Sequence, residues 1–189
     1  MAEPPFSKLF SLGQAFRWPP GAPASPLAIF SGSFNPLHDG HRRMARVAKK
    51  RLKTNVEFEL SVSNVDKPAL LQGEVERRLA QFEQPVWLTW SATFLEKAQV
   101  LPSCTFVVGA DTIVRIADLK YYESLSHRDE AIGELAERTC RFLVFGRVVG
   151  DEFQELGDME LPASLVDLCD SVSEEEFRAD VSSTELRGS

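Results

Sequence analysis

Two of the three histidines in this chain lie three residues apart, in front of a helical pattern. His38 and His41 end the stretch 31–41, which opens with Gly32 directly after the short apolar run 27–30. A glycine turn between a strand and a helix presents backbone amides to an anion, and imidazoles add further donors. The spacing therefore predicts a phosphate-binding site at this turn.

A second segment that favours anions lies near the C-terminus. Residues 181–187 read Val-Ser-Ser-Thr-Glu-Leu-Arg. Hydroxyl side chains followed by a glutamate are typical of a helix N-terminus, where free amides carry partial positive charge. Ser183, Thr184 and Arg187 would then lie together at that helix end. An ordinary helix cap without a ligand explains the same pattern.

Other catalytic patterns are missing from the sequence. It contains no Gly-x-Ser-x-Gly elbow, no Walker A lysine loop and no carboxylate pair of glycosidase character. Cys104, Cys140 and Cys169 have no metal-binding spacing and are interpreted as free thiols in a reducing compartment. His127 stands alone in a polar segment and is interpreted as a surface residue. We expect no metal site built from protein ligands.

Composition limits the classes of partner. The chain has 189 residues and a formal charge of −7, which argues against a general nucleic-acid binder. No apolar stretch is long enough to span a bilayer. Residues 1–26 hold six of the eleven prolines and predict an N-terminal extension with a short helix over 6–16, ahead of one domain over 27–189. We expect a cytoplasmic protein, and the sequence leaves an organellar address open.

Strand-like runs alternate with amphipathic helical patterns through most of the chain. The predicted strands are 27–30, 56–62, 86–89, 105–108 and 141–145, and the predicted helices are 41–53, 74–82, 92–100, 112–116 and 128–139. This alternation predicts an α/β fold, Rossmann-like and doubly wound, with a parallel sheet of five to six strands and helices on both faces. The acidic tail 151–180 is expected to be solvated surface, apart from a hairpin over 148–153 and a short helix over 162–168.

Polar loops follow the predicted strands and should meet at one edge of the sheet. They are residues 31–41, 63–68, 89–91, 109–112 and 146–147. Ligands of open α/β sheets bind at the edge formed by the carboxyl ends of the strands. The sequence therefore predicts one ligand site that gathers these loops.

Three segments carry a resemblance to a known superfamily. The run Ser-Phe-Asn-Pro-Leu-His-Asp-Gly-His at 33–41, after Gly32, resembles the Gly-x-Phe-x-Pro-x-His-x-Gly-His signature of the HxGH nucleotidyltransferase superfamily. Residues 181–187 look like its second signature, Ile-Ser-Ser-Thr-x-x-Arg, and residues 107–112 are similar to its Gly-x-Asp nucleotide loop. The closest branch is that of the nicotinamide and nicotinate mononucleotide adenylyltransferases, and Asn-Val-Asp-Lys-Pro at 64–68 fits a divergent group within it.

The resemblance implies a reaction between ATP and a phosphorylated small molecule. A phosphate of the acceptor attacks the α-phosphorus of ATP and pyrophosphate leaves, with Mg²⁺ carried on the triphosphate mostly through water. By resemblance, His38 and His41 contact the α-phosphate, and Arg187 clamps the β- and γ-phosphates together with Ser183 and Thr184. No nucleic acid and no membrane is implied as a partner, and a homo-oligomer remains open.

The same resemblance assigns the remaining nucleotide contacts. The floor shared by both substrates is implied to be the backbone amides of Gly32, Ser33 and Phe34. Gly109 and Asp111 are implied to hold the ribose of ATP, and Asp111 also suits a helix N-cap. Arg147, after the fifth strand, is either a phosphate contact or a surface residue.

The acceptor side is less defined by the residues. Lys67 is the candidate for the acceptor phosphate, and Trp87 or Trp90 is the candidate for stacking on a pyridine ring. Core packing is the alternative for both: it is favoured for Trp87 inside its strand, and it explains Trp90 in the loop as well as stacking does. The run 87–90 departs from the Val-Asp-x-Trp-Glu of eukaryotic enzymes. CTP in place of ATP, another acceptor such as phosphopantetheine, and a nucleotide-binding regulator without activity are the alternatives.

Overall fold

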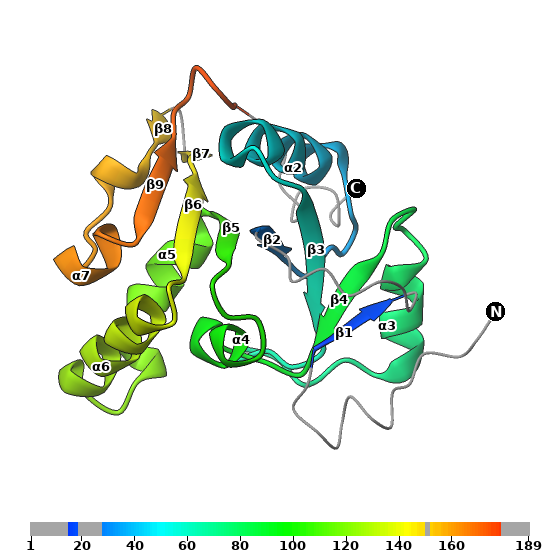
Figure 1. The fold of residues 1–189 in the computed structure, drawn as a ribbon, viewed down its shortest axis with the longest axis horizontal. Coiled ribbons are helices and arrows are strands. Elements are labelled where there is room, and N and C mark those ends of the chain that lie inside the picture. The colour runs from blue at the N-terminus through cyan, green and yellow to red at the C-terminus, as the bar shows by residue number, and fades with distance from the viewer. Residues whose placement is uncertain (1–14, 19–27, 150–151, 179–189) are drawn as a thin grey trace.

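A mostly parallel sheet forms the centre of the protein (Figure 1). The computed structural model describes residues 15–18, 28–149 and 152–178. The sheet has seven strands in the order β1-β4-β3-β2-β5-β6-β9. Their bounds are β1 Phe16–Trp18, β2 Ala28–Ser31, β3 Val56–Ser61, β4 Val86–Thr89, β5 Thr105–Gly109, β6 Arg141–Phe145 and β9 Cys169–Val172. All pairings are parallel except that of β1 with β4, which confirms the predicted α/β class.

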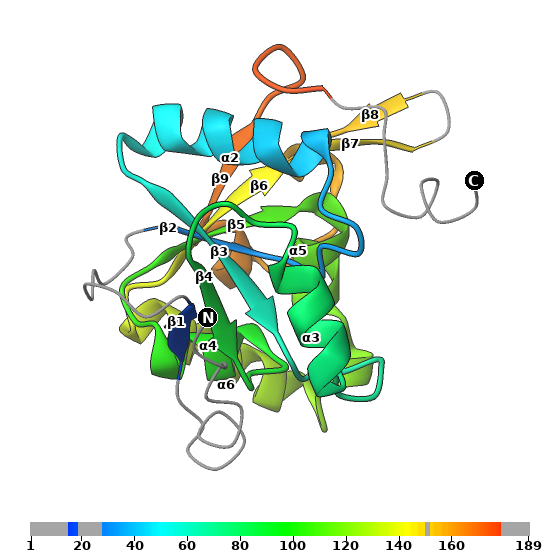
Figure 2. The same cartoon turned by 90° about the vertical axis from the view of Figure 1, so that its right-hand side faces the viewer.

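Helices cover both faces of this sheet, as the doubly wound prediction requires. They are α2 Asp39–Leu52, α3 Gln72–Leu79, α4 Phe94–Val100, α5 Ala110–Ala117, α6 Leu125–Glu137 and α7 Ala163–Val166. Apolar residues of α2 and α3 pack on one face, and those of α4, α5, α6 and α7 pack on the other. Figure 2 shows α2 on one side of the strands, with α4 and α6 on the opposite side.

The strand order places the topological switch between β2 and β5. From β2 the chain adds β3 and β4 on one side, then crosses to β5, β6 and β9 on the other. Helices that leave β2 and β5 therefore diverge to opposite faces, and a crevice opens at the carboxyl ends of these two strands. The turn with both histidines follows β2, so it lies at this crevice.

Two strands lie where the sequence predicted none. Phe16, the last residue of the predicted helix 6–16, lies in β1, Ala15 directly precedes this strand, and residues 6–14 of that prediction lie outside the described residues. Phe16 packs on the apolar cluster between the sheet and helices α2 and α3, and Arg17 forms an ion pair with Glu57 at 2.9 Å. These contacts make residues 16–18 an edge strand of the sheet.

The other unpredicted strand corrects the expectation for the acidic tail. β9 extends the sheet at the opposite edge, where its carboxylate Asp170 faces Arg141 on the surface while Val172 is fully buried. The four residues of β9 show no inward and outward alternation, since Asp170 and Val172 are two residues apart and share a face, so no strand pattern stands out in the acidic run. The predicted hairpin is confirmed as β7 (Arg147–Val149) paired with β8 (Glu152–Gln154), and the predicted short helix as α7.

Candidate functional site

The turn after β2 has room for glycine alone at its first position. Phe34 is 1% exposed, with a φ of 43°, and its ring lies against Gly32. A Cβ at Gly32 would stand 2.7 Å from Cζ of Phe34, closer than any ordinary contact. The amide of Gly32 donates to the carbonyl of Glu59 at 3.1 Å and so ties the turn to β3. Glycine is therefore required at position 32 for a steric reason, because a side chain there would clash with the Phe34 ring of the same turn.

Side chains from α3 and the residues after it hold the rest of this turn. Arg78 is 8% exposed, and it donates to the carbonyl of Ser33 at 2.7 Å while pairing with Glu74 at 2.8 Å. Gln81 donates to the carbonyl of Phe34 at 3.0 Å and accepts from the amide of Leu37 at 2.8 Å. Sequence reasoning missed these positioning residues, because nothing in a helical pattern shows which of its polar side chains turns inward.

We predict that Gly32→Ala lowers both activity and stability. The added methyl group must displace the buried Phe34 ring, and overpacking of this kind costs about 1–3 kcal/mol. Because Phe34 supports the histidines, we also expect turnover to fall by about tenfold or more. The matched control is Gly73→Ala in α3, where a Cβ meets nothing within 4 Å. Thermal unfolding and initial rates are the measurements, and equal behaviour of the two variants would contradict the prediction.

The two histidines form a stacked pair at the start of α2. Their ring centroids lie 3.7 Å apart, and His38 is the N-cap residue of the helix. The amide of His38 donates to Nδ1 of His41 at 3.3 Å. This bond assigns the proton of a neutral His41 to Nε2, which leaves Nε2 as a donor for a ligand. The first-turn amides of α2 add the positive end of the helix to the same site.

Burial keeps both imidazoles uncharged. Desolvation lowers the pKa of His41 to about 3, and the neighbouring His38 adds to this shift. Desolvation also lowers the pKa of His38, against the opposing charge of Asp39. His41 packs edge-on against Phe34 and Phe30, with centroid distances of 5.1 and 5.8 Å. The turn therefore presents neutral imidazoles at neutral pH.

This shift predicts how stability depends on pH. Between the pKa of an unfolded histidine, about 6.5, and the folded value of His41, about 3, the unfolded chain binds more protons than the folded one. The free energy of unfolding should therefore fall as pH drops below about 6.5, by at most about 1.4 kcal/mol per pH unit for this group, and stay level above it. Urea unfolding at pH 7 and pH 5 measures the difference, which should shrink in His41→Gln. An unchanged difference would contradict the lowered pKa.

The ends of β5 and β6 bring two more predicted residues together. Gly109 is the N-cap of α5, and nothing lies within 4 Å of the position where its Cβ would be, so a ligand can approach its backbone. Asp111, in the first turn of α5, forms an ion pair with Arg147 at the start of β7. Both side chains are exposed, at 65% and 45%. A nucleotide at this edge would meet a carboxylate and a guanidinium side by side.

A cavity of about 500 Å³ opens beyond the turn, on the side of β3 and α4. Gly32 and Ser33 line it at the end of β2, and exposed Lys67 lines it from the loop after β3. Its aromatic lining comes from Phe94, Tyr121 and Tyr122. The sequence did not point to these three residues, since they lie after strand or helix ends without a recognisable motif.

The two predicted tryptophans are not part of this lining. Trp87 is half-buried in β4, where its Nε1 donates to Glu57 at 2.5 Å. It packs on the apolar cluster between the sheet and helices α4 to α7. Trp90 packs on the cluster of the opposite face. The core-packing alternative describes both residues, because the alternation along β4 directs them to the two helix layers rather than to the crevice.

A short network fastens the loop that carries Lys67. The hydroxyl of Tyr121 donates to both carboxylate oxygens of Asp66, at 2.8 and 2.9 Å. Arg115 of α5 lies 3.6 Å from the same carboxylate. Asp66 thus joins the loop after β3 to the helix after β5 across the mouth of the cavity.

The second signature lies outside the described residues, but the chain that leads to it is positioned. Phe177 is 5% exposed and packs on Phe145, with ring centroids 5.1 Å apart. The guanidinium of Arg43 lies 5.4 Å from the centre of the Phe177 ring and donates to the carbonyl of Arg178 at 3.2 Å. Arg43 follows His41 by two residues, so the chain approaches the histidine helix before Ser183, Thr184 and Arg187, which themselves are not described.

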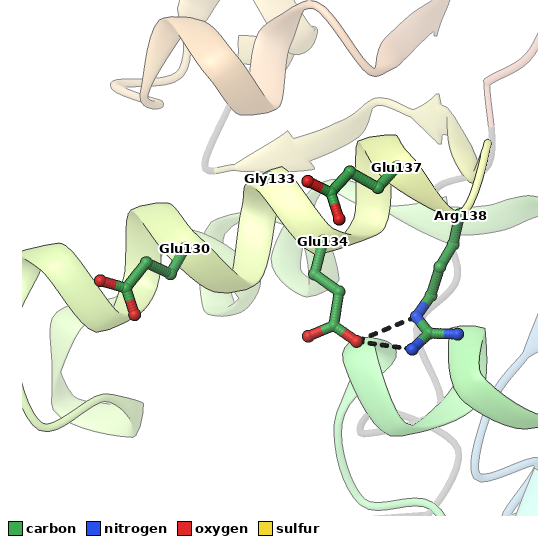
Figure 3. A pocket seen from close by; sticks show the side chains of 5 residues that line it. All are labelled: Glu130, Gly133, Glu134, Glu137 and Arg138. Atoms are coloured by element: carbon green, nitrogen blue, oxygen red, sulfur yellow. Dashed lines mark hydrogen bonds and ion pairs between the residues drawn. The ribbon is translucent and has the colours of Figure 1, made fainter.

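Other groups within the described residues show no competing chemistry. Burial raises the pKa of Cys104 and Cys169 to about 12, so these thiols are poor nucleophiles. No cluster of three or more metal-ligating side chains occurs in the described ranges. A surface hollow on α6 is lined by Glu130, Gly133, Glu134, Glu137 and Arg138. Figure 3 shows that these side chains come from one helical segment, with Glu134 and Arg138 paired to each other.

Comparisons with known proteins agree with this geometry at the level of the family. A family model described as cytidylyltransferase-like matches residues 29–189, from β2 through both signatures. The comparison with curated proteins gives no match. None of the helices in the part of the chain that the structure describes is long and apolar enough to cross a membrane.

Proposed function

This chain belongs to the cytidylyltransferase-like family, and on that premise we propose that it transfers AMP from ATP to nicotinamide or nicotinate mononucleotide and releases pyrophosphate. The family supports a nucleotidyltransferase activity in general. The observation that carries the narrower proposal is the stacked pair of neutral histidines at a helix N-terminus, at the end of a turn whose residues Gly32 and Ser33 line a cavity of about 500 Å³. Such a cavity has the size of a small-molecule site.

The proposed chemistry needs no general base. An oxygen of the acceptor phosphate, already anionic, forms a bond to the α-phosphorus of ATP. The bond from that phosphorus to the bridging oxygen breaks, and the electron pair leaves with pyrophosphate. The protein positions the two phosphates in line and stabilises the charge on the transferring group. These two tasks match a site made of amides, imidazoles and cations.

The ATP half occupies the edge between β2 and β5 in this proposal. His41 donates from Nε2 to the α-phosphate, with His38 and the first-turn amides of α2 around it. The ribose lies at Gly109 and Asp111, where the backbone is open. Arg147 then gives up some of its hydrogen bonds to Asp111 and binds a phosphate of ATP instead. Mg²⁺ enters as part of the nucleotide substrate rather than through a protein site.

The acceptor half occupies the cavity beyond the turn. Its phosphate lies near Ser33, where it faces the α-phosphorus, and Lys67 adds a positive charge; the amide of Gly32 is not a donor here, because it already bonds to the carbonyl of Glu59. Its ring lies deeper, with Phe94 and Tyr122 as the aromatic neighbours instead of the tryptophans.

A cytidylyltransferase is the second candidate, favoured by the description of the matching family. The fold and the phosphate contacts would be unchanged, and only the pocket for the nucleotide base would differ. A comparison of ATP with CTP at equal concentration separates the two candidates.

The test is release of pyrophosphate from each nucleotide in the presence of a panel of phosphorylated acceptors. We expect the highest rate with ATP and one of the two mononucleotides. Turnover with CTP alone would move the assignment to the second candidate. Tight ATP binding by calorimetry, without product from any acceptor, would instead indicate a nucleotide-binding regulator.

A further inference from the structure

One face of β3 is polar although it lies under a helix layer. Glu57, Glu59 and Ser61 alternate with the buried Phe58 and Leu60, so the three polar residues share the face that α4 covers. On the same face, strands β2, β5 and β6 of the sheet contribute apolar side chains to the core. A polar stripe under one helix of an otherwise apolar layer is costly unless it is fully paired.

The centre of this stripe is a buried ion pair. Glu59 is 0% exposed and Lys97 of α4 is 5% exposed. The ammonium of Lys97 donates to both carboxylate oxygens of Glu59, at 2.8 Å each, and the hydroxyl of Thr89 also donates to this carboxylate. Lys97 has three N–H groups. Two of them bond to Glu59, and one remains for another partner.

Both members of the pair line the acceptor cavity. The cavity is bounded by Glu59 from β3 and by Lys97 from α4, with Phe94 one turn before Lys97 on the same helix. The ammonium of Lys97 also lies 5.8 Å from the centre of the Phe94 ring. A planar ring that contacts Phe94 would therefore carry its substituent close to Lys97.

The charge balance of the pair decides which substituent is favoured. Glu59 already neutralises Lys97, so the ammonium offers a hydrogen bond without an uncompensated charge. A carboxamide oxygen can accept this bond. A carboxylate would place a second negative charge beside the buried Glu59, which is unfavourable.

We propose that Lys97, held and neutralised by Glu59, selects an acceptor with a neutral carboxamide over one with a carboxylate. Lys97 is the specificity-determining residue, and Glu59 acts through it as a positioning residue. The inference rests on the proposed function. Of the two candidate acceptors, it selects nicotinamide mononucleotide. Repulsion of an acceptor carboxylate by Glu59 is as important for this selectivity as the hydrogen-bond donor on Lys97.

Equilibrium binding of nicotinamide mononucleotide and nicotinate mononucleotide to the full chain tests this without relying on turnover. We expect the nicotinamide form to bind the wild-type protein more tightly. In Glu59→Gln the charge of Lys97 is no longer compensated, and the ratio of the two affinities should shift toward the nicotinate form by about tenfold or more. Ratios of kcat/KM should shift in the same direction.

Glu57→Gln is the matched control, because Glu57 shares the strand and the face but pairs with Arg17 and Trp87 outside the cavity. It should leave the affinity ratio unchanged. The double variant Glu59→Gln with Lys97→Met keeps the pair neutral and removes the donor, so it should weaken nicotinamide mononucleotide selectively. Thermal unfolding of each variant shows which of them fold.

The outcomes separate this inference from the proposed function. Preferential binding of the nicotinamide form without turnover would refute the proposed reaction and leave the selectivity intact. Turnover of both mononucleotides with a ratio that Glu59→Gln does not change would overturn the inference and leave the reaction. Loss of stability in Glu59→Gln with no change in ratio would show that the pair is only structural. Binding of neither mononucleotide would overturn both.

Discussion

Replacing His41 with alanine is expected to lower kcat by about two orders of magnitude or more. Loss of one preorganised donor to a transferring group typically costs a factor of this size. His41 is well placed for such a role because the amide of His38 fixes its tautomer and the ring of Phe34 fixes its orientation. Initial rates of pyrophosphate release at saturating ATP and acceptor measure the effect.

The control for this variant lies on the same helix. Lys49 is exposed on the outer side of α2, so Lys49→Ala should leave kcat within about twofold. Thermal unfolding should show that both variants fold. Near-normal turnover in His41→Ala would contradict the role that we give to the histidine pair.

Arg187→Ala is expected to reduce kcat/KM for ATP by about a hundredfold or more. The substitution removes the guanidinium, and with it the proposed bidentate contacts to the β- and γ-phosphates, where negative charge accumulates as pyrophosphate leaves. Although Arg187 lies outside the described residues, the burial of Phe177 and the bond from Arg43 to Arg178 lead the chain toward α2. Kinetics at varied ATP concentration measure the loss.

Arg178→Ala is the control for Arg187→Ala. Arg178 is an exposed arginine of the same tail, and it pairs with Glu174. We expect little change in its kcat/KM for ATP. An equal loss in both variants would point to a general role of the tail, and normal kinetics in Arg187→Ala would remove the second signature from the ATP site.

The sequence was sufficient for the parts of the fold that follow local rules. The buried strands β5 and β6 and the amphipathic helix α2 each show the expected pattern, so the α/β class was predictable. β1 was not, because three residues in a proline-rich segment become a strand only when β4 offers an edge. β9 was hidden because it has only four residues, lies in an acidic run and shows no alternation of buried and exposed residues.

The site shows the same division between local and long-range information. The turn at 31–41 and the loop at Gly109 were predictable from their motifs. The cavity was not, since it depends on residues such as Lys97 and Tyr121 that meet only through tertiary packing. The placement of Trp87 depended on which neighbour its indole nitrogen finds, and that neighbour, Glu57, lies on another strand.

The neutral histidines also explain how the site tolerates two imidazoles in contact. Two charged rings with centroids 3.7 Å apart would repel each other, and burial avoids this by lowering the pKa of both. A bound phosphate would oppose that shift, because a nearby anion stabilises the protonated imidazole. The pair can therefore respond to the nucleotide with added positive charge.

Identification of the product by mass spectrometry tests the central claim most directly. The purified full chain is incubated with ATP, Mg²⁺ and nicotinamide mononucleotide, and the products are quantified together with pyrophosphate. We expect a dinucleotide whose mass equals that of the acceptor plus an AMP unit, formed in a one-to-one ratio with pyrophosphate. ATP that remains intact while the protein binds it, with no dinucleotide from either mononucleotide, would contradict the proposed reaction.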